Sequence, residues 1–236
     1  MTMRAIIRFG CGPLIVVAIA SVFAGDVLAS DTTRPEDVSS KARRNSRTDS
    51  SSLSSISQSA RAESKEIEGM RDAAEQGVAQ AQFSLGLCYQ NGHGVAKDAN
   101  QAIEWFRKAA EQGFDEAQYT LGCCYNGDDG FAKDPAEAAK WWEKAATQGF
   151  ADAQYCLGLS YSMGQGVAQN PAAAAKWWSK AAQQEHADAQ YFLGLSYAKG
   201  LGVPKTREQA VYWLRKAASH ENENAVAALR QLGADR

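Results

Sequence analysis

The sequence predicts an all-α protein, and more specifically a right-handed α-solenoid of helix-turn-helix repeats. Three observations lead to this fold class. A block of 36 residues recurs four times without a slip in register, and each block holds two stretches with the apolar spacing of helices. Alanine is abundant, whereas alternating β-branched and aromatic residues are scarce. Repeated units of about 20 to 50 residues bury their apolar faces against their neighbours, so the blocks should stack.

The chain begins with the features of a secretory signal peptide. Arg4 and Arg8 precede an apolar stretch over 14–24, which is shorter than the roughly 20 apolar residues of a membrane-spanning helix. Small residues favour cleavage after Ala29, with Ala24 as the second candidate. We therefore expect residues 1–29 to be removed and the mature protein to be exported, either to a periplasm or out of the cell. An uncleaved signal that anchors the chain in a membrane is the alternative.

Residues 30–62 are rich in serine and charge and hold almost no large apolar side chains, which predicts a disordered linker. Residues 1–65 carry nine Lys and Arg against six Asp and Glu. The remainder carries 16 against 21, a net charge of -5. This mildly acidic remainder argues against nucleic acid as the partner, because phosphate binding needs clustered basic residues.

The predicted repeat array covers residues 63–236, with repeats at about 81–116, 117–152, 153–188 and 189–224. Each repeat reads as a first helix, a glycine-containing loop and a second helix. The residues that recur in step include Leu85, Leu121, Leu157 and Leu193 in the first helices and Trp105, Trp141, Trp177 and Trp213 in the second helices.

The second helices have clear beginnings, buried faces and ends. Their expected N-caps are Asp98, Asp134, Asn170 and Thr206, and Pro135 and Pro171 follow at the first helical position. A helical wheel places Ala102, Trp105, Phe106, Ala109 and Ala110 on one side, which predicts a half-exposed outer helix. Glycines stop the earlier helices at Gly77, Gly113 and Gly149, whereas Glu185 and Glu221 stand at that place in the last two repeats.

The first helices are apolar on three sides, so we expect them to lie inside the array. Small Ser84 and Cys88 should face the second helix of the same repeat, which leaves the strip of Gln82, Gly86 and Gln90 open. Stacked repeats would align such strips along a concave groove that holds a protein or peptide partner. The predicted partner-binding residues are Gln82, Gln90, Gln118, Asn126, Gln154, Ser162 and Gln190.

Partial repeats are expected at both ends of the array. Residues 63–76 match only a second helix, and residues 225–232 match only a first helix, in which Arg230 replaces the recurring glycine. Such units cover the apolar faces of the terminal repeats. Large apolar patches outside packing positions are not evident, so we expect a monomer.

The repeat pattern Ala-x-x-x-Leu-Gly-x-x-Tyr, Gly-x-Gly-Val, Ala-x-x-Trp-x-x-x-Ala-Ala resembles the Sel-1-like repeat family, a relative of the tetratricopeptide repeats. The resemblance covers about residues 66–232. It implies an adaptor that assembles protein complexes, and exported bacterial members act in envelope signalling, host contact or regulation. Some secreted relatives look like disulfide-stapled arrays. Here Cys88, Cys123, Cys124 and Cys156 all fall on first helices, so the second helices offer no partner cysteine. Cys88, Cys124 and Cys156 fall on the buried strip of small residues, which favours free core thiols, with Cys124 and Cys156 as the pair to check.

The chain shows no constellation of residues that would predict an enzyme, a cofactor site or a metal site. Its three histidines, His93, His186 and His220, are dispersed. Ser196 and Lys199 spell S-x-x-K, a motif of β-lactam-binding enzymes, but its companion motifs are missing from the array. Two alternatives to a protein-binding scaffold stay open: an envelope protein that binds cell-wall glycan, and a β-lactam-hydrolysing enzyme.

Overall fold

The computed structural model describes residues 65–127 and 131–234, and the regular elements in these ranges are all α-helices. The predicted signal peptide and linker, residues 1–62, lie outside the described residues. The described chain starts with a helical segment over 65–75. It is followed by α2 (Ala79–Asn91), α3 (Ala99–Glu111), α4 (Asp115–Asn126), α5 (Pro135–Thr147), α6 (Ala151–Met163), α7 (Pro171–Gln183), α8 (Ala187–Lys199), α9 (Arg207–Ser219) and α10 (Glu223–Gln231).

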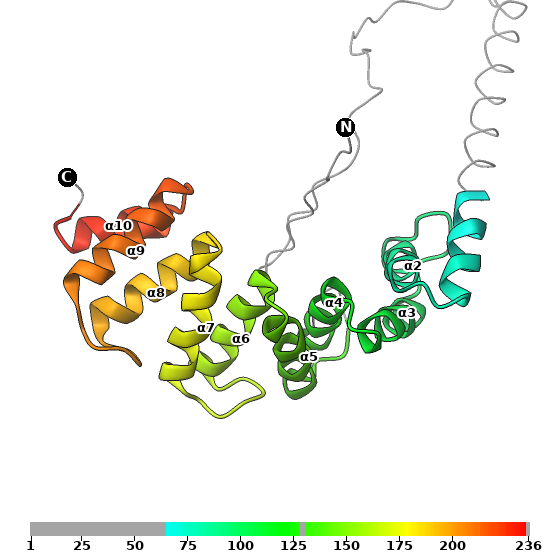
Figure 1. Ribbon diagram of the computed structural model, residues 1–236, viewed down its shortest axis with the longest axis horizontal. Coiled ribbons are helices and arrows are strands. Elements are labelled where there is room, and N and C mark those ends of the chain that lie inside the picture. Colours follow the sequence, from blue (N-terminus) through cyan, green and yellow to red (C-terminus); the bar gives the residue numbers. More distant parts are fainter. Residues whose placement is uncertain (1–64, 128–130, 235–236) are drawn as a thin grey trace, which may run out of the picture. The chain divides into compact units, whose positions relative to one another are not determined.

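The helices succeed one another along a single array, which confirms the predicted α-solenoid (Figure 1). Each of the helices from α2 to α10 packs against its neighbours in sequence, and the packing is most extensive within a repeat. The first helices of the repeats are α2, α4, α6 and α8, and the second helices are α3, α5, α7 and α9. The helical segment over 65–75 and α10 add one helix at each end, as the sequence predicts.

The second helices begin as expected, with one exception. The carboxylates of Asp98 and Asp134 each accept two backbone N–H groups, and Asn170 accepts one. Thr206 also occupies the N-cap, but its hydroxyl donates to the Pro204 carbonyl at 3.2 Å and makes no capping bond. Three of the four predicted side-chain caps are therefore formed.

The predicted buried face of the second helices is confirmed. In α3, Ala102, Trp105, Phe106, Ala109 and Ala110 are at most 9% exposed. The recurring lysines, which follow the tryptophans by three positions, cover the outer faces of the rings and make cation–π contacts. Their Nζ atoms lie 3.8 Å from the Trp105 ring for Lys108, 3.6 Å from Trp141 for Lys144 and 4.1 Å from Trp177 for Lys180.

The first helices are oriented differently from the prediction, because glycine rather than serine and cysteine faces the second helix of the same repeat. A β-carbon added to Gly86 would lie 2.6 Å from the Phe106 ring. Gly122 and Gly158 lie in the same way against Trp142 and Trp178. Glycine permits the closest approach of two helices, which accounts for its place in the middle of a helix despite a cost of about 1 kcal/mol relative to alanine.

The cysteines lie on the first helices as predicted, with Cys124 and Cys156 buried in the core. Cys88 and Cys123 are half-buried. The Sγ atom of Cys88 lies 3.9 Å from Sδ of Met70 in the preceding helical segment. Cys88 therefore faces the previous repeat and not the second helix of its own repeat.

The second helices end in a left-handed residue. Gly77, Gly113 and Gly149 have φ angles of +91°, +90° and +103°. Glu185 and Glu221 adopt the same conformation, with φ angles of +65° and +61°. The left-handed backbone conformation is less favourable by about 1 to 2 kcal/mol for a residue with a β-carbon than for glycine. The last two repeats therefore carry local strain at Glu185 and Glu221.

Replacing Glu185 by glycine is expected to raise the free energy of unfolding by about 1 kcal/mol, because it relieves this strain at an exposed position. Urea denaturation followed by circular dichroism measures the change. The reciprocal variant Gly149→Glu should lose a similar amount. A Glu185→Gly variant that is no more stable than the wild type would contradict the prediction.

Candidate functional site

The expectation that a ladder of glutamines stands open along a groove is wrong. Gln82, Gln90, Gln118, Gln154 and Gln190 are all buried, with at most 8% of each residue exposed. Their side of the first helix lies against neighbouring helices, because the glycine beside them draws the second helix close. The other two predicted residues, Asn126 and Ser162, are half-buried.

Three of the buried glutamines, Gln82, Gln118 and Gln154, join successive repeats through hydrogen bonds. Nε2 of Gln154 donates to the carbonyl of Ala146 in the last turn of the preceding second helix, at 3.1 Å. Oε1 of Gln154 accepts from Nε2 of Gln184 at 2.9 Å. The same bonds recur, with Gln82 between Ala74 and Gln112, and with Gln118 between Ala110 and Gln148. These glutamines are structural, because each one satisfies a helix-terminal carbonyl and is itself satisfied.

The last repeat breaks this pattern. Nε2 of Gln190 donates to Ala182 at 3.1 Å. In the last repeat, His220 occupies the position that Gln112, Gln148 and Gln184 hold in the earlier repeats, and its side chain is exposed. Oε1 of Gln190 is accordingly buried with no hydrogen-bond partner among the described residues.

The variant His220→Gln is expected to stabilise the last repeat by about 1 kcal/mol, because its amide can donate to Oε1 of Gln190 as in the other repeats. Denaturant unfolding gives the change in stability, and hydrogen exchange of α8 to α10 shows whether it arises in this repeat. His220→Ala serves as the control and should give no gain. Equal stability of the two variants would contradict the prediction.

The opposite side of the first helices remains accessible, and we name it the first-helix face. Its first-turn row consists of Gln80, Glu116, Asp152 and Asp188. Its mid-helix row consists of Leu87, Cys123, Leu159 and Leu195. Beside this row lie the aromatic residues Phe83, Tyr119, Tyr155 and Tyr191, of which Tyr119 is buried and the other three are half-buried. The mid-helix row is half-buried throughout, so apolar surface runs along all four first helices. Exposed Met163, at the end of α6, extends this surface.

A hollow of about 250 Å³ opens into this face beside the ends of α6 and α8. Trp178, Phe192, Leu195 and Leu201 form its apolar walls, and Ser162 and Lys199 also line it. Leu201 in the wall of the hollow is 51% exposed, and Met163 at the end of α6 is 54% exposed. Ser162 is thus the one predicted residue that lines this hollow.

Carboxylates follow one edge of the first-helix face and contact the next repeat. Oδ1 of Asp152 lies 3.2 Å from Nε2 of His186, and Oδ1 of Asp188 accepts from Nδ2 of Asn222 at 2.8 Å. Asp115 raises the pKa of Glu116 through a side-chain hydrogen bond, and partial burial adds to this effect. This edge therefore carries negative charge along α4, α6 and α8.

The described residues do not assemble a catalytic constellation from the groups that the sequence singled out. The Ser196 residue is 2% exposed, and its hydroxyl donates to the Phe192 carbonyl at 2.8 Å. Nδ1 of His186 accepts the N–H of Ala189 at 3.2 Å, while Nε2 faces Asp152. Both ring nitrogens are therefore engaged. Within residues 65–127 and 131–234 there is no cluster of three His, Cys, Asp or Glu side chains that could hold a metal ion.

Every helix in the described part of the chain is too short or too polar to cross a lipid bilayer.

Comparison with known proteins identifies the repeats. The Sel1 repeat model matches residues 79–114, 115–150, 151–186 and 187–222, two residues earlier than the boundaries expected from the sequence. No curated protein matches the chain.

Two solved structures are similar in both sequence and fold. A Sel1 repeat protein from Oxalobacter formigenes is 42% identical, with a TM-score of 0.66, over 72% of this chain and 50% of that protein. The c5321 protein of uropathogenic Escherichia coli, a protective antigen with an SLR fold, is 37% identical, with a TM-score of 0.68, over 72% of this chain and 37% of that protein. The chain thus spans half or less of each relative. The four matched repeats and the stacked helix pairs show that the chain belongs to the Sel1 repeat family.

Proposed function

We propose that the chain is an exported, monomeric scaffold that binds an extended segment of a partner protein along its first-helix face. Sel1 repeat proteins are in general scaffolds for protein–protein interaction and are mainly non-enzymatic. The observation that carries the proposal is the continuous apolar mid-helix row, which stays half-exposed on all four first helices. In a repeat array such a surface offers the same contact at each step along an extended partner.

The chemistry of this face indicates the kind of segment that would fit. Apolar side chains of the partner would lie on the mid-helix row, and one of them would enter the hollow lined by Trp178, Phe192 and Leu195. Basic side chains would lie near the edge formed by Glu116, Asp152 and Asp188. The segment would therefore combine apolar with basic residues.

Two exposed residues, Leu201 at the hollow and Met163 at the end of α6, allow a test that leaves the core intact. We expect the double variant Met163→Asp and Leu201→Asp to lose bound partner at least tenfold, because it places charge where apolar contact is required. The measurement is quantitative capture from an envelope extract of the source organism on the immobilised mature chain. Lys176→Asp, which adds an aspartate to the exposed surface of α7, is the matched control. Retention of the same proteins by the double variant would reject binding at this face.

Export is tested separately from binding. Mass spectrometry of the full chain after expression in a bacterium should find a mature N-terminus at Ser30, or at Gly25 if cleavage follows Ala24. The processed chain should lie outside the cytoplasm. An intact N-terminus on cytoplasmic protein would overturn this part of the proposal.

A further inference from the structure

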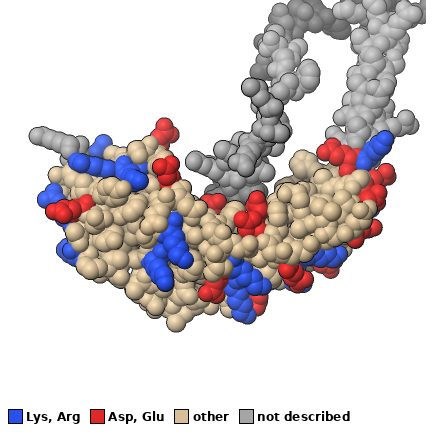
Figure 2. All heavy atoms as spheres, in the orientation of Figure 1, with Lys and Arg blue, Asp and Glu red and all other residues tan. Residues whose placement is uncertain are grey.

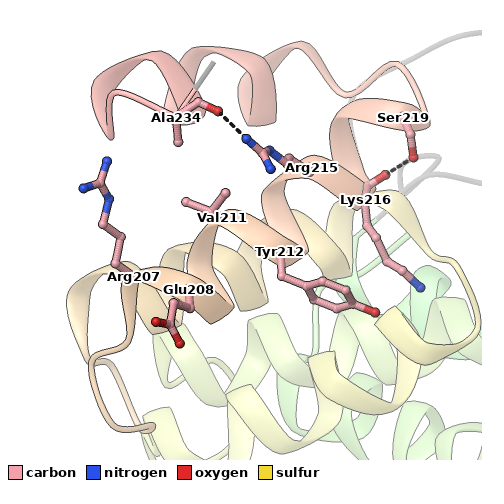
Figure 3. A pocket seen from close by; sticks show the side chains of 8 residues that line it. All are labelled: Arg207, Glu208, Val211, Tyr212, Arg215, Lys216, Ser219 and Ala234. Carbon is pink, nitrogen blue, oxygen red and sulfur yellow. Dashed lines mark hydrogen bonds between the residues drawn. The ribbon is translucent and has the colours of Figure 1, made fainter. Parts of the chain in front are cut away.

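A second surface of interest lies at the C-terminal end of the array, on the outer face of α9. A hollow of about 800 Å³ is lined there by Arg207, Val211, Tyr212, Arg215, Lys216 and Ala234, among others. Figure 3 shows Val211 between the two arginines, with Arg215 directed toward Ala234. The α9 residues recur every three or four positions, so they share one side of the helix.

The repeat register shows what occupies the equivalent place in earlier repeats. Arg71 donates to the hydroxyl of Tyr89 at 3.3 Å, and Arg107 donates to the hydroxyl of Tyr125 at 2.6 Å. In both pairs the arginine lies on a second helix and the tyrosine lies near the end of the next first helix. Arg215 is the third arginine at this position of the repeat.

The repeat register does not place a tyrosine opposite Arg215. The position 36 residues after Tyr197 is Gly233, which follows the end of α10. Arg215 instead donates to the backbone carbonyl of Ala234 at 3.3 Å. The hollow therefore lies where the other two arginines hold a phenol ring.

Apolar surface is also exposed at this end. Among the residues equivalent to Val211, Ala139 and Ala175 are 3% and 2% exposed, whereas Ile103 is half-buried. Val211 is only half-buried, and Tyr212 is 50% exposed. An aromatic ring from a partner would pack on the exposed apolar surface of Val211 and Tyr212.

The charge of the hollow is opposite to that of the array. Among the described residues that line the hollow, Arg207, Arg215 and Lys216 are basic and Glu208 is acidic, whereas residues 66–236 carry 16 Lys and Arg against 21 Asp and Glu. Basic side chains also gather over α9 and α10 in the space-filling view (Figure 2). Two copies of this end placed symmetrically together would oppose arginine to arginine, so charge favours a different, acidic partner.

We propose that this hollow docks a segment of a partner protein that presents a tyrosine beside acidic residues. The tyrosine hydroxyl accepts a hydrogen bond from Arg215, as that of Tyr125 does from Arg107, and its ring packs on Val211 and Tyr212. The carboxylates lie near Arg207 and Lys216. This surface lies on a second helix and is separate from the first-helix face.

The probe for this site comes from the chain itself. A fluorescein-labelled peptide with the sequence of residues 120–131, with both cysteines changed to alanine, carries Tyr125 followed by Asp128 and Asp129. Fluorescence anisotropy should show saturable binding to the mature chain. The protein variant Arg215→Ala, or a peptide with Tyr125→Phe, should bind about tenfold more weakly, as expected for the loss of a hydrogen bond to a charged group. Arg230→Ala, which removes an exposed cation of α10 outside the hollow, should bind as the wild type does.

A fusion removes the requirement that a short peptide folds in solution. In this fusion, residues 124–150 of the chain, with Cys124→Ala, follow directly after Gln231 and replace residues 232–236. The tyrosine of position 125 then stands at position 233 of the fusion, two residues after Gln231. The fusion should unfold at a higher temperature than the wild type, and Arg215→Ala should abolish the gain. If neither peptide binding nor the gain depends on Arg215, the proposal is wrong. Concentration-dependent self-association that requires Arg215 would overturn the assignment to a different protein.

Discussion

The variant Gly166→Ala is expected to lower the free energy of unfolding by about 3 kcal/mol. Gly166 has a φ angle of +73°, and a β-carbon at this position would overlap the carbonyl group of Pro135 at the start of α5. Backbone cannot move aside as the end of a flexible side chain can. The substitution therefore adds a steric clash between repeats to the strain of a left-handed alanine.

A second glycine separates these two contributions. Gly113 has a φ angle of +90°, but no atom lies within 4 Å of the position that its β-carbon would occupy. Gly113→Ala should cost only about 1 kcal/mol, since conformational strain acts alone. Urea denaturation of both variants by circular dichroism gives the comparison. Equal losses would show that the loop does not press on the neighbouring repeat as the structure indicates.

The second helices could be predicted from the sequence almost completely. Their apolar residues fall on one side of a helical wheel, so Ala102, Phe106 and Ala109 point to the core without knowledge of the neighbours. Asp98 and Asp134 mark the first turns, because side-chain caps depend on residues only two or three positions away. Interactions between residues so close in the chain can be predicted from the sequence alone.

The first helices could be recognised but not oriented. The apolar residues of α6 itself are spread around most of the helix, so a helical wheel does not distinguish its buried side from its accessible side. Gln154 appeared accessible because glutamine is usually found at the surface. Its burial depends on Ala146 and Gln184, which belong to the preceding second helix and to the end of its own repeat. That arrangement exists only after the repeats have stacked.

One signal for the correct orientation was present in the sequence. A glycine recurs in the middle of each first helix at Gly86, Gly122, Gly158 and Gly194, where it is unfavourable for helix formation. A recurring glycine within a helix indicates close approach of another backbone or ring. This requirement places a second helix against the glycine, and it therefore predicts that the glutamines next to the glycine in space lie on the buried side.

Exchanging Gln154 for methionine is expected to destabilise the array by about 2 kcal/mol, although the volume of the side chain hardly changes. The substitution removes two hydrogen bonds, one to the Ala146 carbonyl and one from Nε2 of Gln184, and each is worth about 1 kcal/mol. The Ala146 carbonyl still accepts the N–H of Gly149 at 3.2 Å. Gln184 keeps its bond to the carbonyl of Gly149 at 2.9 Å, which limits the loss.

Gln190→Met is the matched control, because Oε1 of Gln190 accepts no hydrogen bond from the described residues. Only its bond to Ala182 is lost, and an unsatisfied oxygen is removed at the same time, so the cost should stay near 1 kcal/mol. Urea denaturation measures both variants, and the capture assay should show that folded Gln154→Met retains the partner. Loss of the partner without loss of stability would return the glutamines to the binding surface, since a purely structural group acts on binding only through the fold.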